Sequence, residues 1–122
     1  MKRFVAVAVL ASGVAVAGAQ AAQPVNLSTN TAGELADLCA SAPLKPGTDA
    51  KINFCRGFAQ GAITVKLDQA GDKKPFCFPN PSPSRAKTMS EFIAWVKAMP
   101  ERRSLASADG LFRFLGERYP CK

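Results

Sequence analysis

The sequence predicts an all-α fold: a small four-helix up-down bundle with two disulfides and a proline-rich loop between the second and third helices. Three observations predict this class. Apolar residues recur with the 3.6-residue period of a helix in separate stretches, and two of these stretches open with a capping box. The four cysteines make an even set. Four prolines within residues 71–85 exclude a helix there.

Residues 1–21 are expected to be a cleavable secretory signal peptide. The start is positively charged, residues 4–18 are apolar or small and carry no charge, and residues 19–21 (AQA) have the small residues that signal peptidase accepts. The apolar run is shorter than the ~20 residues of a spanning helix, so a retained membrane anchor is the minor alternative. We expect cleavage after Ala21, which leaves residues 22–122 as one soluble domain with no stable membrane anchor.

The charge of the mature chain is basic but dispersed. The sequence has sixteen Lys and Arg against nine Asp and Glu, a net charge of +7, and removal of Lys2 and Arg3 lowers it to +5. Such a charge favours acidic partners, although ordinary solubilising charge explains it equally well. Basic residues stand singly or in pairs among acids, with no basic run and no interleaved aromatics, so nucleic acid is not an expected partner.

The first helix is expected over residues 31–40. Thr31 and Glu34 make a capping box, in which the hydroxyl and the carboxylate each bind a backbone amide at the helix start. Prolines and a glycine within residues 41–47 end the helix. Its expected inward residues are Leu35, Leu38 and Cys39.

The second helix is expected from Thr48 to about Gln69 and is the longest. Apolar residues at helical spacing define its inner face, and the pattern fades before Gly71. Gly57 and Gly61 lie four residues apart on one face, where we expect a neighbouring helix to approach closely. The expected inward residues are Ile52, Cys55, Phe58, Ala59, Ala62 and Ile63.

A long loop is expected over residues 71–85, followed by the last two helices. A second capping box, Thr88 with Glu91, is expected to open the third helix, which Pro100 ends. The fourth helix is expected over residues 105–119. The expected buried residues of these two helices are Phe92, Ile93, Trp95, Val96 and Met99, then Leu105, Ala108, Leu111, Phe112, Leu115 and Tyr119.

Cys39, Cys55, Cys77 and Cys121 are expected to form two disulfides, because export places them in an oxidising compartment. A zinc site would need four widely separated thiolates, since the chain has neither CxxC spacing nor histidine. Alternating helices bring the end of the first helix to the start of the second, and Cys77 to the chain end. This favours Cys39 with Cys55 and Cys77 with Cys121. The competing pairs need a nearly extended connector and stay open as strained alternatives.

Residues for catalysis are sparse. Without histidine the chain has no Ser-His or Cys-His pair and no imidazole to bind a metal. Glu34 and Glu91 are interpreted as helix caps, and Glu101, Asp109 and Glu117 as solvated charges, so no catalytic carboxylate pair is expected. No glycine-rich phosphate loop occurs. We therefore expect no enzyme activity, no metal and no cofactor, and a function in recognition.

Four segments around the cysteines occur in a characteristic order: AGELADLCA, FCRGFAQGA, PFCFP and a terminal RYPC. This order resembles the Rap/Tai family of type VI secretion immunity proteins over nearly all the mature chain, with Phe58 where Tyr is more usual. The resemblance implies an all-helical, disulfide-bonded periplasmic protein. It also implies binding to a peptidoglycan amidase effector and steric blockage of the catalytic groove of that enzyme, often by a homodimer.

The proline-rich segment of residues 79–87 is the best candidate for binding a partner, because it is long, polar and tethered by Cys77. A plain connector is the alternative interpretation. Two other functions stay open: a periplasmic stress chaperone that acts when acid loosens it, and an inhibitor of another cell-wall enzyme. The candidate partner-binding residues are Asn80, Ser82, Ser84, Arg85 and Lys87.

Overall fold

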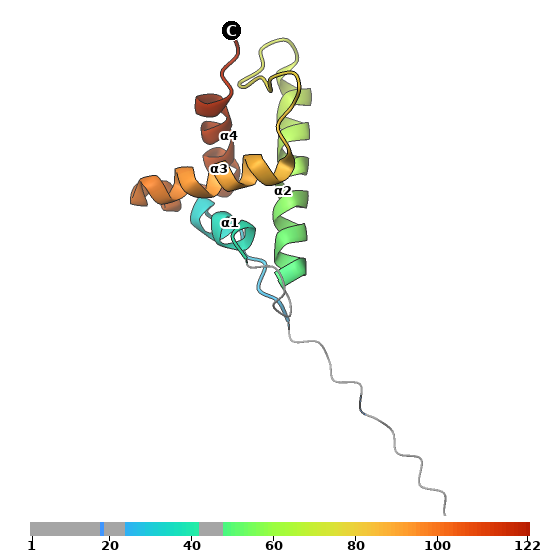
Figure 1. The fold of residues 1–122 in the computed structure, drawn as a ribbon, viewed down its shortest axis with the longest axis vertical. Coiled ribbons are helices and arrows are strands. Elements are labelled where there is room, and N and C mark those ends of the chain that lie inside the picture. The colour runs from blue at the N-terminus through green and yellow to red at the C-terminus, as the bar shows by residue number, and fades with distance from the viewer. Residues whose placement is uncertain (1–17, 19–23, 42–47) are drawn as a thin grey trace, which may run out of the picture.

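The computed structural model describes residue 18, residues 24–41 and residues 48–122, and this part of the chain is mainly helical (Figure 1). Its elements are α1 (Ala32–Cys39), α2 (Thr48–Ala70), α3 (Arg85–Ala98), the 3-10 helix η1 (Pro100–Ser104) and α4 (Ser107–Arg118). The described residues form no strand, and an isolated β-bridge joins Thr31 to Ala106. The predicted all-α class is therefore confirmed. The predicted signal peptide lies outside the described residues except for Gly18.

α1 begins with the predicted capping box. The Thr31 hydroxyl accepts a hydrogen bond from the Glu34 amide at 3.2 Å, and the Glu34 carboxylate accepts one from the Thr31 amide at 3.1 Å. The next amide, of Ala32, donates to the Leu105 carbonyl at 2.8 Å and so ties the start of α1 to the chain before α4. Leu35 is fully buried, which places α1 at the centre of the core.

α2 buries Cys55 and Ala59, as predicted, but its glycines do not receive a neighbouring helix. A Cβ built on Gly57 or Gly61 would meet nothing within 4 Å. The prediction of a close approach there is wrong, because at 100° per residue Gly57 lies about 200° around the helix from Cys55, on the side away from α1. Although α2 has 23 residues, no helix among the described residues is long and apolar enough to cross a membrane.

The N-cap of α3 is Ser84, four residues before the predicted cap Thr88. The Ser84 hydroxyl accepts a hydrogen bond from the Lys87 amide at 3.1 Å. Thr88 is instead buried inside the helix, where its hydroxyl donates to the Ser84 carbonyl at 3.2 Å. The predicted capping box of Thr88 and Glu91 is therefore wrong. Ser84 is an equally suitable cap, and the Arg, Ala and Lys that follow it all favour a helix.

The chain between α3 and α4 also differs from the prediction. Pro100 opens a 3-10 helix, and Leu105 has an extended backbone (φ −62°, ψ 147°) rather than the helical one we expected. The Leu105 carbonyl accepts the hydrogen bond from Ala32, which holds it outside a helix. As a result α4 starts at Ser107, two residues later than predicted.

The helices are not arranged as the predicted up-down bundle. Figure 1 shows α3 starting beside α2 and running across α4, with the shorter α1 on the lower side of α3 in that view. The core lies at this crossing, where the buried rings of Phe92 and Phe114 have centroids 5.6 Å apart. The loop of residues 71–84 connects α2 to α3, and the Cys77–Cys121 disulfide holds it at the end of α4 before it returns to α3.

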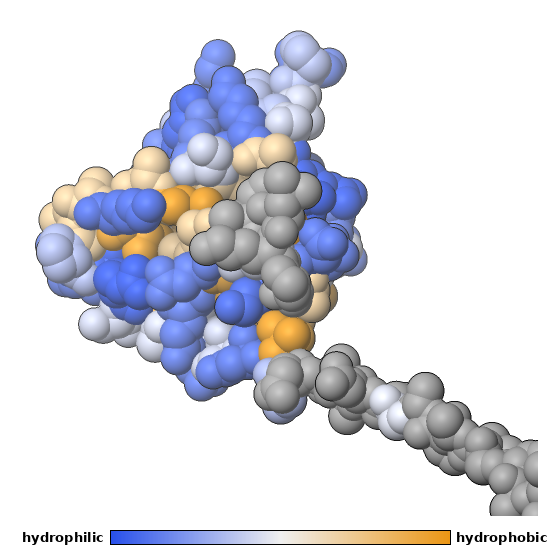
Figure 2. Space-filling model, turned by 60° about the horizontal axis from the view of Figure 1, so that its bottom comes forward, coloured by the Kyte–Doolittle hydropathy of each residue, from blue (hydrophilic) through white to orange (hydrophobic). Residues whose placement is uncertain are grey.

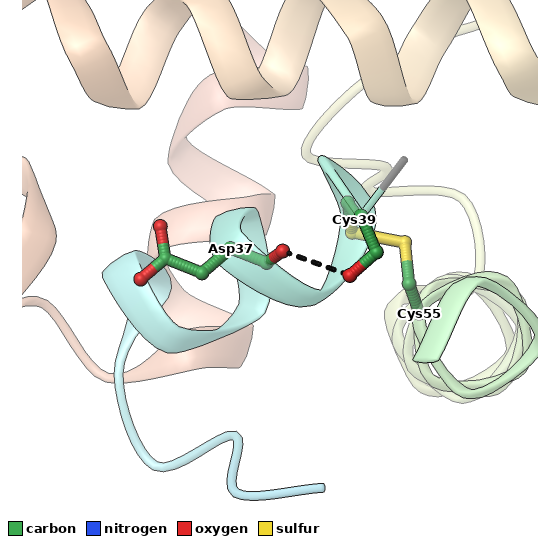
Figure 3. Close-up of a disulfide and its surroundings, with 4 residues drawn as sticks. Asp37, Cys39 and Cys55 are labelled. Atoms are coloured by element: carbon green, nitrogen blue, oxygen red, sulfur yellow. Dashed lines mark hydrogen bonds between the residues drawn. A yellow bond between two sulfur atoms is a disulfide. The ribbon is translucent and has the colours of Figure 1, made fainter. Parts of the chain in front are cut away.

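Both predicted disulfides are present, and the competing pairings are excluded. Cys39 at the end of α1 bonds to Cys55 of α2, with Cα atoms 5.2 Å apart; Figure 3 shows this bridge joining the two helices. Cys77 bonds to Cys121 with Cα atoms 4.9 Å apart. The Cys77 amide also donates to the Tyr119 carbonyl at 2.8 Å, so the loop and the chain end are joined twice.

Candidate protein-binding site

The proline-rich loop is anchored by aromatic side chains as well as by its disulfide. Phe76 is 1% exposed, and its ring lies 5.9 Å from that of the half-buried Phe78. The Phe78 ring in turn lies 5.2 Å from that of Tyr119. The Asn80–Pro81 peptide bond is cis. Residues 71–84 therefore contain no helix or strand, yet they are fixed to the body of the protein.

The predicted partner-binding residues fall into two groups. Asn80 and Ser82 lie on the loop, whereas Arg85 and Lys87 belong to the first turn of α3, with Ser84 as its N-cap. All five residues are exposed. The predicted loop therefore ends at Ser84, and a helix holds the two cationic candidates. The part that these residues play in binding stays a prediction.

A pocket of about 220 Å³ lies between α2 and the start of α3. Its lining includes the apolar side chains of Ile63 and Met89, one from each helix. Arg56 of α2 and Arg85 of α3 also line it, as does Ser82 of the loop. Two of the five predicted residues, Ser82 and Arg85, thus line the same pocket. Arg56, which the sequence analysis did not single out, lines it too.

A wider groove of about 950 Å³ lies between the loop and the chain end. It is lined by Asn80, Ser82 and Lys87, and by Arg118 and the residues that follow it. Ser82 borders both the groove and the pocket, so the loop forms the wall between them. Four of the five predicted residues line one of these two hollows.

Glu91 of α3 binds the end of α4. Arg118 donates two hydrogen bonds to the Glu91 carboxylate, at 3.0 and 3.2 Å, and the Tyr119 hydroxyl donates one at 2.8 Å. The bond from Arg118, followed by that from Tyr119, holds the pKa of Glu91 below its ordinary value. Burial raises the pKa of Tyr119. Arg118 therefore faces the groove with its charge already paired.

A second cluster joins α3, η1 and α4 around Trp95. The indole N–H of Trp95 donates to the Glu117 carboxylate at 2.6 Å, and this bond is the main reason that the pKa of Glu117 is lowered. The Arg102 guanidinium lies 4.0 Å from the indole ring centroid and donates to the Trp95 carbonyl at 2.6 Å. The interpretation of Glu117 as a merely solvated charge is therefore wrong. Local patterns missed the cluster because Trp95 and Glu117 are 22 residues apart.

The chemistry that the described residues offer is that of recognition. In this part of the chain no three His, Cys, Asp or Glu side chains are grouped where they could hold a metal ion. Figure 2 shows one face of the molecule, on which hydrophilic side chains cover much of the surface and apolar side chains gather in smaller areas. The pocket and the groove beside the loop are concave, partly apolar and lined by cations, which suits them to bind a protein.

Comparison with known proteins identifies one family. The family model of the Rap1a immunity proteins matches residues 31–121. The matched region contains α1 to α4, both disulfides, the loop and the two hollows beside it. No curated protein and no solved structure matches the chain.

Proposed function

The chain belongs to the Rap1a immunity protein family, and from this premise we propose that it protects a cell by binding a secreted effector. The effector we propose is a peptidoglycan amidase delivered by a type VI secretion system. The protein would cover the catalytic groove of the amidase and so exclude its substrate. Such a protein acts by steric blockage and needs no catalytic residue of its own.

The observation that carries this proposal is the family match, which spans the whole disulfide-bonded body of the protein. A blocking protein benefits from a surface that is already ordered, because less conformational freedom is then lost on binding. The loop meets this requirement, since Phe76 is buried and Cys77 is bonded to Cys121. The cations beside it have the same sign as the net charge of the chain, which is +7 with Lys2 and Arg3 and +5 without them, and they favour an acidic partner surface.

We propose the periplasm as the site of action. Two disulfides are typical of proteins in oxidising compartments. The sequence of residues 1–21 supports export through a signal peptide that is cleaved after Ala21. Mass spectrometry of the protein recovered from a periplasmic extract should give a chain that begins at Ala22. A chain that keeps residues 1–21 and stays with the membrane would contradict this part of the proposal.

Inhibition of the amidase tests the main proposal. The protein is expressed with its leader, purified from the periplasm and added to the amidase effector encoded beside its gene, with purified peptidoglycan as substrate. We expect inhibition of the amidase to be complete near one equivalent of the protein. The mass of the complex also shows whether the protein binds as a homodimer. A control sample denatured after reduction of its disulfides should not inhibit.

Two results would favour the other functions. If the amidase stays fully active, and the protein instead prevents aggregation of unfolded clients only at acid pH, the protein is a stress chaperone. If it leaves the amidase active but inhibits another cell-wall hydrolase, it is an inhibitor of that enzyme. Either result would overturn the proposal of immunity to an amidase.

A further inference from the structure

We propose that the pocket between α2 and α3 receives an apolar side chain of the partner, with an acidic residue of the same partner segment bound by Arg56 and Arg85. This inference rests on the proposed function and specifies where and how the effector is recognised. It predicts that the contact surface of the effector carries a carboxylate directly beside an exposed apolar residue.

The size of the pocket indicates a side chain as the occupant. Its volume of about 220 Å³ is below the ~300–1,000 Å³ of typical clefts for small-molecule ligands. It is large enough for one apolar side chain, and Ile63, Phe78 and Met89 supply apolar walls. Central pockets that an apolar or aromatic anchor fills carry much of the energy in protein interfaces.

The charge at the pocket indicates an acidic neighbour. Among the six arginines in the described residues, four form ion pairs with carboxylates of this chain: Arg102, Arg103, Arg113 and Arg118. Arg56 and Arg85 form none within the described part of the chain, and both line the pocket. Two guanidinium groups from different helices can bind one carboxylate through charge-assisted hydrogen bonds.

The walls of the pocket are held in place before any partner arrives. Met89 and Ala59 are 8% and 4% exposed, so the α3 and α2 sides are parts of the core. Phe78, on the loop side, is held by its contacts with Phe76 and Tyr119. The pocket therefore needs little reorganisation on binding, unlike the open surface of α2 around Gly57.

Charge reversal tests the two arginines. In Arg56→Glu and Arg85→Glu the affinity for the amidase effector, measured by calorimetry, should fall by about tenfold or more, and by more at low salt than at high salt. Lys97→Glu is the matched control, because Lys97 is an exposed cation in the last turn of the same helix as Arg85 and lines no pocket described above. The control should bind within about twofold of the wild type. If all three variants bind equally well, the inference is wrong.

Filling the pocket tests the apolar part of the inference. Gln60 is exposed and lines the pocket, so Gln60→Trp should obstruct it and weaken binding without disturbing the core. Asn53→Trp places the same bulk about two turns earlier on α2, at an exposed residue outside the pocket, and should bind as the wild type does. Far-ultraviolet circular dichroism and the melting temperature show that both variants are folded. Equal binding by both would contradict a role of the pocket.

A peptide titration separates this inference from the proposed function. The probe is acetyl-Glu-Phe-Glu amide, compared with acetyl-Gln-Phe-Gln amide, and the readout is the NMR methyl signal of Met89. The acidic peptide should shift this signal, the neutral one should shift it less, and Arg85→Glu should abolish the difference. If the wild type fails to bind the amidase, the proposed function fails, and the titration alone decides the inference. Equal shifts by the two peptides, or none, would then overturn it.

Discussion

Gly110, in the first turn of α4, has the least room for a side chain among the glycines of the described residues. A Cβ built there would lie 2.6 Å from the Cβ of Ala32, which is itself fully buried in α1. Gly57 is the opposite case, since a Cβ there would meet nothing within 4 Å. The same substitution should therefore have opposite effects at these two helical glycines.

We predict that Gly110→Ala lowers the free energy of unfolding by about 1–3 kcal/mol, because the helices must separate to admit the methyl group. Gly57→Ala should raise it by about 0.5–1 kcal/mol, because alanine restricts the unfolded chain and favours the helix. Chemical denaturation of both variants and the wild type measures the two changes. Similar changes of the same sign would show that α1 and α4 are not packed this closely.

The hydrogen bonds to Glu91 make the stability of the protein depend on pH. Because they lower the pKa of Glu91 in the folded protein below its ordinary value of 4.5, the folded state binds fewer protons than the unfolded state near that pH. The contribution of Glu91 to the free energy of unfolding is therefore fully present above about pH 5.5. It is lost as the pH falls from there through the lowered pKa of the folded state.

We predict that Glu91→Gln has a lower melting temperature than the wild type at pH 7, and that the difference shrinks as the pH is lowered toward 3. Glu101→Gln, at an exposed position of η1, is the control and should follow the wild-type curve. Thermal melts followed by circular dichroism at several pH values give the comparison. The difference in melting temperature between Glu91→Gln and the wild type could instead stay constant over this pH range. That result would show that the charge of Glu91 is not the cause of the difference.

Among the elements, the start of α3 connects the fold to the candidate site. Ser84 caps this helix, and Arg85 directly follows it at the pocket. A sequence contains several Ser and Thr that could act as caps, and local chemistry alone does not rank Ser84 above Thr88. Burial decides between them, because the interior position of Thr88 beside Met89 and Phe92 makes it part of the packed face of α3.

We predict that Ser84→Ala lowers the free energy of unfolding by about 1 kcal/mol, because the Lys87 amide loses its acceptor. Ser90→Ala changes an exposed residue in the middle of the same helix and should leave stability unchanged or raise it slightly. Urea denaturation resolves a difference of this size. If the two variants are equally stable, Ser84 is not the cap of α3.

For the whole molecule, the two disulfides hold together a chain with a small core. The bridges span 16 and 44 residues, and the second closes over the proline-rich loop, α3 and α4. Most of the stabilisation by such bonds comes, in the chain-entropy description, from restriction of the unfolded chain. Loss of either bond should therefore reduce stability even though Cys77 and Cys121 are themselves exposed.

We predict that Cys39→Ala with Cys55→Ala lowers the free energy of unfolding by about 3 kcal/mol, and Cys77→Ala with Cys121→Ala by about 4 kcal/mol. Both losses are large against the ~5–15 kcal/mol stability of a typical domain. Guanidinium denaturation measures them, and Cys77→Ala alone should match the second double variant. A loss below about 1 kcal/mol in either double variant would contradict the chain-entropy account.

The sequence by itself determined the features that depend on neighbouring residues. Helical periodicity and caps predicted the four helices, with α1 and α2 placed to within one residue of their observed limits. Proline excluded a helix from residues 71–84 because it lacks the amide that a helix needs. The helix map also predicted both disulfide pairs. Cys39 and Cys55 belong to consecutive helices, whereas Cys77 and Cys121 are separated by α3 and α4, and their pairing was predicted from an alternation of helix ends that the fold does not follow in detail.

The tertiary structure alone decided what depends on residues far apart in the chain. The bond from Ala32 to Leu105 delays the start of α4, and the crossing of α3 replaces the predicted up-down bundle. The pocket likewise has Arg56 and Arg85 in one lining, although the two residues are 29 positions apart in the chain. Periodicity describes which side of a helix is apolar but not the angle at which two helices cross. Side-chain packing in the folded core sets that angle, and with it the site.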